Sequence, residues 1–232
     1  MWVIISFFVI FGFSVFLILF VKIKNRKLLE TVTKHYRGTN TERNLVLRLL
    51  KYGIPAQSIF HDLYVKKSSG NFSQIDLVVA TKVGIIVFEV KDYSGWIFGR
   101  GNQNQWTQVL AYCKEKYRFY NPIMQNNGHI TALKKQLKQF ENLPFYSVIV
   151  FYGNCRLKDV SFIPQGTFLT YSERVIDVIN TIMNKNESVN YSDKLEIIRV
   201  LKEAVQNGED IEIRNKHIKN IRDMLGNDRI FE

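Results

Sequence analysis

The longest hydrophobic run of the chain lies at its start. Residues 2–21, WVIISFFVIFGFSVFLILFV, contain no charged side chain. A helix of twenty residues, at about 1.5 Å per residue, is roughly 30 Å long and matches the hydrocarbon core of a bilayer. No basic residue precedes the run, and no A-x-A-like cleavage site follows it. The pattern therefore favours an uncleaved transmembrane helix over a signal peptide.

Beyond this run, the hydrophobic spacing predicts alternating strands and helices. Thr39 and Glu42, ahead of apolar residues at helical spacing, are typical of a capping box that opens an amphipathic helix. Asn121 and Pro122 predict the start of a helix that runs to about Phe140. Strands are expected over 59–67, 72–80, 84–91, 96–98, 105–110, 145–152 and 167–171. Polar-faced helices are expected near 172–184, 192–207 and 210–225.

Three charged residues interrupt the most apolar of these strands. If the strands over 72–80 and 84–91 pair around Thr81–Gly84, Ala80 lies opposite Ile85 and Asp76 opposite Glu89. Lys91, two residues beyond Glu89, projects from the same face of the sheet. Directly opposed like charges destabilise a strand pair, so the position of the two carboxylates calls for an explanation.

A divalent cation between the two carboxylates removes their repulsion. Few oxygen ligands, with room for water and a phosphate, suit Mg²⁺. Such a cation with its water, beside the ammonium of Lys91, suits phosphodiester hydrolysis. The alternative is a surface ladder of salt bridges in which Lys91 neutralises one of the acids.

Charge and cysteine content indicate the orientation in the membrane, the cellular compartment and the partners of the protein. Lys22, Lys24, Arg26, Lys27, Lys34 and Arg37 follow the apolar run with the single acid Glu30, which predicts an outside N-terminus and a cytoplasmic C-terminal part. This flank is expected to contact anionic lipid headgroups. The formal net charge of +11 is compatible with nucleic acid as a partner. Two cysteines, Cys113 and Cys155, fit a reducing compartment and exclude a disulfide framework.

The segments around the charged hairpin resemble a known family. Asp76, twelve residues and then Glu89-Val90-Lys91 are similar to the D…(D/E)xK core of restriction-endonuclease-like nucleases. The run GIIVFEVKDYSGWIFG, then Trp106-x-Gln108, then NPIMQNNGHITALKKQL, resembles the nuclease-related (NERD) domain over about residues 35–152. Leu77 is a departure, because many members carry histidine after the aspartate.

The resemblance implies roles for individual residues. Asp76 and Glu89 would be metal ligands, Val90 would lend its carbonyl to the metal, and Lys91 would be the catalytic lysine. Glu42 matches the acidic residue of the family's first helix, and Gln125 the glutamine of its N-P-x-x-Q segment. Glu42 is equally well explained as a cap, since it occupies the third helical position. Gln125 and His129 lie one turn apart, and either could be an ordinary packing residue.

Together these observations predict an α/β protein with a mixed central sheet flanked by helices, restriction-endonuclease-like. One transmembrane helix precedes the domain and a helical tail follows it. The expected divisions are a membrane anchor (1–21), a basic juxtamembrane linker (22–37), the nuclease domain (38–171) and a helical C-terminal extension (172–232). The expected function is a membrane-anchored, Mg²⁺- or Mn²⁺-dependent nuclease acting on DNA or RNA in the cytoplasm. The alternatives are a non-catalytic nucleic-acid-binding or scaffolding module at the membrane, and a lipid-surface protein whose acidic hairpin is only structural.

Overall fold

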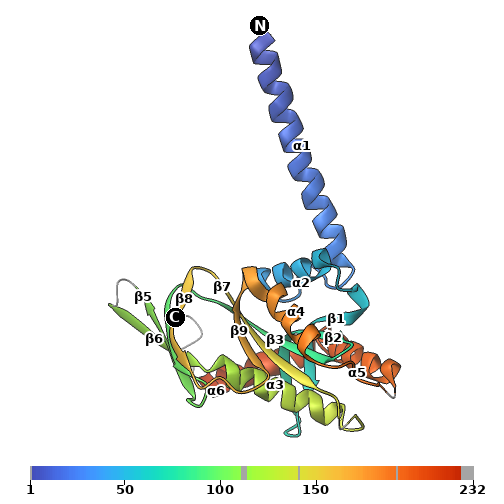
Figure 1. Ribbon diagram of the computed structural model, residues 1–232, viewed down its shortest axis with the longest axis vertical. Coiled ribbons are helices and arrows are strands. Elements are labelled where there is room, and N and C mark those ends of the chain that lie inside the picture. The colour runs from blue at the N-terminus through green and yellow to red at the C-terminus, as the bar shows by residue number, and fades with distance from the viewer. Residues whose placement is uncertain (1, 111–113, 141, 192, 226–232) are drawn as a thin grey trace.

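The computed structural model describes residues 2–110, 114–140, 142–191 and 193–225, without the side chains of residues 2–5, 7–9 and 222–225. Its first helix, α1 (Trp2–Glu30), extends away from the rest of the molecule (Figure 1). Within the described residues, no helix has both the length and the apolar character needed to cross a membrane. Part of the expected membrane span over 2–21 has no described side chains, so the span stays a prediction. Cys113 lies outside the described residues.

The larger of two sheets has five strands in the order β1-β2-β3-β7-β9. The strands β1, β2 and β3 pair antiparallel, whereas β3, β7 and β9 run parallel to one another. This mixed sheet confirms the expected central sheet, and its strand bounds lie close to those predicted. They are Ile59–Lys66 (β1), Phe72–Thr81 (β2), Gly84–Asp92 (β3), Phe145–Tyr152 (β7) and Thr167–Tyr171 (β9).

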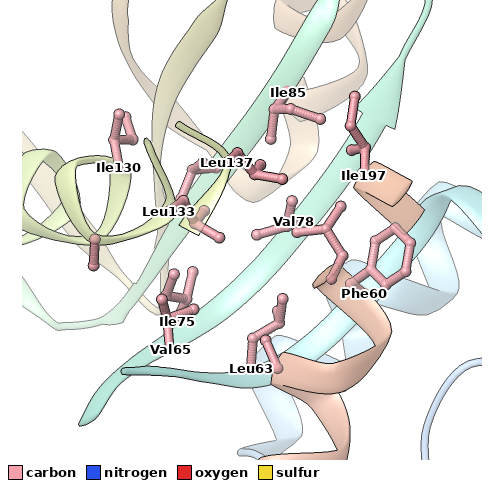
Figure 2. Close-up of a cluster of buried hydrophobic side chains, with 14 of the residues drawn as sticks. Phe60, Leu63, Val65, Ile75, Val78, Ile85, Ile130, Leu133, Leu137 and Ile197 are labelled. Atoms are coloured by element: carbon pink, nitrogen blue, oxygen red, sulfur yellow. The ribbon is translucent and has the colours of Figure 1, made fainter. Parts of the chain in front are cut away.

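Helices cover both faces of this sheet. On one face, α3 (Pro122–Gln136) and α5 (Lys194–Asn207) pack on β1, β2 and β3, with Leu133 and Ile197 close to Val78 (Figure 2). On the other, α2 (Asn40–Tyr52) and α4 (Val175–Lys185) contribute Leu45 and Ile179 to a second core cluster. The described residues also form the 3₁₀ turns η1 (Ala56–Ser58) and η3 (Ser172–Arg174) and the helix α6 (Ile211–Leu225).

These contacts bear on the expected C-terminal extension. The helix α5 buries apolar side chains in the first core cluster and α4 in the second, so each helix belongs to one of the two layers that cover the larger sheet. The division of the chain at residue 172 stays a prediction.

A second sheet of four strands was not expected from the sequence. Its order is β6-β5-β4-β8, with the strands Gly95–Arg100 (β4), Gln105–Leu110 (β5), Glu115–Tyr120 (β6) and Cys155–Ser161 (β8). The expected central sheet is therefore one of two mixed sheets in the described residues, and β6 and β8 went unpredicted. Both carry several charged side chains and bury little, so neither contains an apolar run like those of the larger sheet. A third core cluster around Trp106 and Phe151 packs between the sheets.

The two predicted helix starts are confirmed. Thr39 caps α2, its hydroxyl accepting the Glu42 N–H at 3.3 Å, and Asn121 caps α3, its side chain accepting the Ile123 N–H at 2.9 Å. The helix α3 ends at Gln136 rather than near Phe140. Leu137 and Phe140 still reach the core from the turn that follows, which explains why their apolar pattern resembles a further helical turn.

The basic flank is partly held inside the protein. Arg37 is only 3 % exposed, and its Nε donates to Asp62 Oδ2 at 2.7 Å. Lys34 Nζ contacts Glu209 Oε1 at 2.9 Å and Arg26 pairs with Glu30 within α1. Three of the six bases expected to face lipid therefore have partners in the protein itself.

Candidate active site

Two aspartates, Asp62 on β1 and Asp76 on β2, lie where the ladder between these strands is interrupted. Pairing continues on both sides, through His61–Leu77 and Leu63–Ile75, but Asp62 and Asp76 do not pair. Asp62 has a left-handed φ of +56° and holds the buried Arg37. Phe60 and Leu63 face the same core although they are three residues apart, and so do Ile75 and Val78. Since neighbours in a strand normally alternate, both strands change face at the two aspartates.

The charged hairpin has the predicted register. Ala80 pairs with Ile85, and the β2–β3 ladder runs as far as Leu77–Phe88. Asp76 and Glu89 are the next positions in this register, where the ladder stops. In its place, the Val90 backbone N–H donates to Asp76 Oδ2 at 2.7 Å. The strands thus separate at the first acidic position, and a carboxylate takes over a backbone contact.

This contact also fixes the direction of the Val90 carbonyl. In an extended strand, the N–H and C=O groups of one residue point to the same side. Because the Val90 N–H points to Asp76, its carbonyl oxygen is directed to the same side of β3. The sequence places Val90 among the expected metal ligands, and the backbone direction is compatible with that role.

Glu89 is the most enclosed member of the site, with 1 % of its surface exposed. Lys91 Nζ lies 2.7 Å from its Oε1, and His129 Nε2 lies 3.1 Å from its Oε2. Burial alone raises the pKa of this carboxyl, but the charge of Lys91 and the His129 contact outweigh it and hold the pKa below its usual range. Glu89 is therefore an ionised, doubly held carboxylate.

Lys91 is held from two sides. Its ammonium contacts Glu89 and also donates to Gln125 Oε1, in the first turns of α3, at 3.0 Å. Burial alone lowers the pKa of Lys91, but the neighbouring Glu89 carboxylate outweighs this and leaves the pKa raised. The structure thus brings together Lys91, Glu89 and Gln125, three of the residues singled out in the sequence.

Asp76 has the opposite character. Burial, together with the charges of Glu89 and Glu42, raises its pKa well above the usual range. Its Oδ1 accepts no hydrogen bond among the described residues, whereas Oδ2 accepts the Val90 N–H. The carboxyl favours a proton, or another positive charge, near the open oxygen.

Sequence reasoning gave little weight to His129, yet this residue joins the site. It is 7 % exposed, and its Nδ1 lies 2.8 Å from Ser73 Oγ on β2 while its Nε2 faces Glu89. The one available signal was its position one helical turn after Gln125, on the same side of α3.

Glu42 is part of the helix cap and also has a second, buried carboxylate oxygen. Its Oε1 accepts the Thr39 hydroxyl at 2.8 Å, as in a cap, while its buried Oε2 lies 3.4 Å from His61 Nε2 and accepts no hydrogen bond. Burial alone raises the pKa of Glu42, but the His61 and Thr39 contacts outweigh it and lower the pKa. The charge of Glu42 helps to raise the pKa of Asp76, although the two side chains form no direct contact.

The oxygen donors of this site fit a hard divalent cation. In the described part of the chain, no three His, Cys, Asp or Glu side chains come close enough to hold a metal by themselves. Mg²⁺ commonly takes one or two carboxylates and completes its shell with water and substrate phosphate. Asp76, Glu89 and the Val90 carbonyl can supply such a set of ligands. The raised pKa of Asp76 means that its ionised form lacks sufficient positive charge nearby, which a bound cation would provide.

The central strands of the mixed sheet thus separate at the Asp76…Glu89-x-Lys91 positions, and Lys91 and His129 both contact Glu89 there. The sequence profile of the nuclease-related domain family (NERD) matches residues 37–152, so the chain belongs to this family. An uncharacterized protein of Bacillus anthracis is 29 % identical over 196 residues, covering 82 % of this chain and 87 % of that protein. No solved structure matches the chain.

Proposed function

We propose that the protein is a divalent-metal-dependent nuclease that hydrolyses phosphodiester bonds of nucleic acid. The observation that carries the proposal is the ion pair of Lys91 and Glu89 beside Asp76. The pKa of Asp76 is raised by burial and by two neighbouring carboxylates. Membership of the nuclease-related domain family supports the same chemistry.

Asp76, Glu89 and the Val90 carbonyl would hold Mg²⁺ or Mn²⁺. When bound, such a cation supplies positive charge that polarises a phosphoryl oxygen. The ammonium of Lys91, kept in place by Gln125, stabilises the negative charge that develops on the phosphate in the transition state. Glu42 contributes a further negative charge near Asp76 and favours cation binding there.

The proposal is tested by incubating the full-length protein in detergent with labelled single- and double-stranded DNA and RNA. We expect cleavage with Mg²⁺ or Mn²⁺ and none with EDTA. Binding without cleavage in the presence of either metal would favour the alternative, a non-catalytic nucleic-acid-binding module that keeps the nuclease fold.

The second part of the proposal is attachment to the cell membrane through residues 2–21, with residues 22–232 in the cytoplasm. Its support is the uncharged apolar sequence and the exposure of apolar side chains along α1, with Ile10, Phe13 and Phe16 each more than 60 % exposed. Among the described bases of the flank, Lys22, Lys24 and Lys27 form no ion pair within the protein and remain for anionic headgroups.

A further inference from the structure

The second sheet has one face that packs inward and one that does not. Ile97, Trp106 and Phe119 turn toward the core cluster between the sheets. Since side chains alternate along a strand, the residues next to them project from the opposite face. We call this opposite side the outer face of the second sheet.

The strand register assembles the outer face into rows that cross the sheet. In the first row, Lys116 pairs with Val109, Val109 with Trp96, and Trp96 with Arg156. In the second row the paired residues are Arg118, Thr107, Phe98 and Asp159. An aromatic ring on β4 thus lies inside each row, with a basic side chain on the edge strand β6.

The chemistry of this face is aromatic and basic. Trp96 is 40 % exposed, and Tyr120, also on the outer side of β6, is 54 % exposed. The ammonium of Lys158 lies 4.9 Å from the centre of the Trp96 ring. Basic residues outnumber acidic ones here, with Arg100, Lys116, Arg118, Arg156 and Lys158 against Asp159.

The outer face is also hollowed. A pocket of about 170 Å³ opens over β4 and β5, with Phe98, Gln105, Thr107 and Asp159 in its lining. It therefore offers an aromatic ring beside an amide, a hydroxyl and a carboxylate, which are groups that can hydrogen-bond the edge of a base.

We infer that the outer face of the second sheet is a binding surface for single-stranded nucleic acid. Aromatic side chains stack on bases only where the base faces are free, which excludes an intact duplex as the preferred ligand. Basic groups at the edges suit the phosphates. The four strands span three spacings of about 4.8 Å, or roughly 14 Å, and a sheet of this size can stack two or three bases.

The chain connects this surface to the candidate active site. β4 begins four residues after Lys91, and β6 leads directly into the cap of α3, the helix that carries Gln125. Tyr93, between Lys91 and β4, packs on Phe119 of β6 with ring centres 4.6 Å apart. Binding of single-stranded nucleic acid here does not depend on the proposed nuclease function; only the cleavage of the bound nucleic acid does.

Binding is measured by fluorescence anisotropy of a labelled mixed-sequence single strand with the full-length protein in detergent and EDTA, so that no cleavage occurs. We expect Trp96→Ala and Tyr120→Ala each to raise Kd about 5- to 150-fold for the single strand, the usual range for loss of one stacked base. Trp96→Phe should recover part of the loss. The matched control is Tyr52→Ala, because Tyr52 on α2 is an aromatic residue whose exposure of 47 % lies between those of Trp96 and Tyr120.

The basic edge is tested by salt dependence. The double change Lys116→Ala with Arg118→Ala should flatten the slope of log K against log salt by about 1.4, the value for two phosphate contacts on a single strand. The control is Lys51→Ala with Lys185→Ala, two exposed bases at the ends of α2 and α4.

Several outcomes would overturn the inference: no single-strand binding by the wild-type protein, unchanged Kd in both aromatic variants, or equal losses in the controls. So would a Lys116/Arg118 variant that loses only its binding to phosphatidylserine vesicles, since that would make the surface a membrane contact. Failure of the nuclease proposal looks different, because a protein that binds through Trp96 and never cuts retains this surface without the activity.

Discussion

Replacement of Asp76 by asparagine tests the electrostatics of the site without changing its shape. The amide oxygen of asparagine can still accept the Val90 N–H, so the 2.7 Å contact that ends the β2–β3 ladder is retained. The substitution removes a carboxylate whose pKa is raised well above its usual range by burial and by the charges of Glu89 and Glu42. The change therefore removes a repelling charge and one proposed metal ligand together.

The sign of the pH dependence follows from that raised pKa. Between the pKa of the unfolded chain and the higher pKa of the folded state, the native protein holds a proton that the unfolded chain has released. Stability therefore falls as the pH rises through this window, by about 1.4 kcal/mol for each unit that separates the two values. Without metal at pH 7, we expect Asp76→Asn to be as stable as the wild-type protein or more so, with the difference shrinking toward pH 4.

Metal reverses the comparison. Mg²⁺ or Mn²⁺ at a hundred times its dissociation constant stabilises the native state by about 2.7 kcal/mol. For a domain of this size, that raises Tm by about 5 to 11 °C. We expect the wild-type protein to show such a shift and Asp76→Asn to lose most of it.

The assay is thermal unfolding of the full-length protein in detergent, with EDTA and with a metal titration, from pH 4 to pH 8. Asp92→Asn is the matched control, since Asp92 is an exposed acid at the end of the same strand as Glu89. A clear loss of stability in metal-free Asp76→Asn at pH 7 would refute the reasoning and support a structural salt-bridge ladder. An undiminished metal shift in Asp76→Asn would refute the assignment of Asp76 as a ligand.

Two further predictions concern the support of the site and the orientation of the chain. His129→Ala should lower metal affinity or cleavage by about 10- to 100-fold, as loss of a residue that orients a metal ligand commonly does. His217→Ala should change neither, because His217 contacts the Phe72 carbonyl of β2 rather than Glu89. Unchanged calorimetric metal affinity and unchanged cleavage in His129→Ala would remove it from the site. A reporter fused after Glu232 should be active only as a cytoplasmic reporter, and protease-accessible, exported C-termini would contradict the proposed orientation.

The larger sheet was predictable because its signals are local. Apolar runs, the Thr81–Gly84 turn and the caps at Thr39 and Asn121 lie within a few residues of what they determine. The register of the hairpin followed from counting, and with it the adjacent positions of Asp76 and Glu89. The second sheet was missed because β6 and β8 carry several charged side chains and no apolar run, and because β8 joins β4 through a distant pairing.

The side chains that complete the site depend on contacts between distant segments. His129 reaches Glu89 only because α3 packs over β3 and β7, and no spacing in the sequence indicates that contact. Arg37 was counted with the lipid-facing bases, yet the left-handed Asp62 on β1 holds it inside. Charge along a sequence does not reveal which bases will find a buried partner.

The most direct test of the central claim is the cleavage rate of Lys91→Ala relative to wild-type protein, with nucleic-acid binding measured in parallel. Lys82→Ala, an exposed lysine in the turn before the same strand, is the control. With Mg²⁺ or Mn²⁺ present, we predict wild-type cleavage, a fall on the order of a hundredfold in Lys91→Ala, and binding weakened by no more than about one phosphate contact. Wild-type protein that binds nucleic acid without cutting it, or Lys91→Ala that cuts at the wild-type rate, would contradict the account.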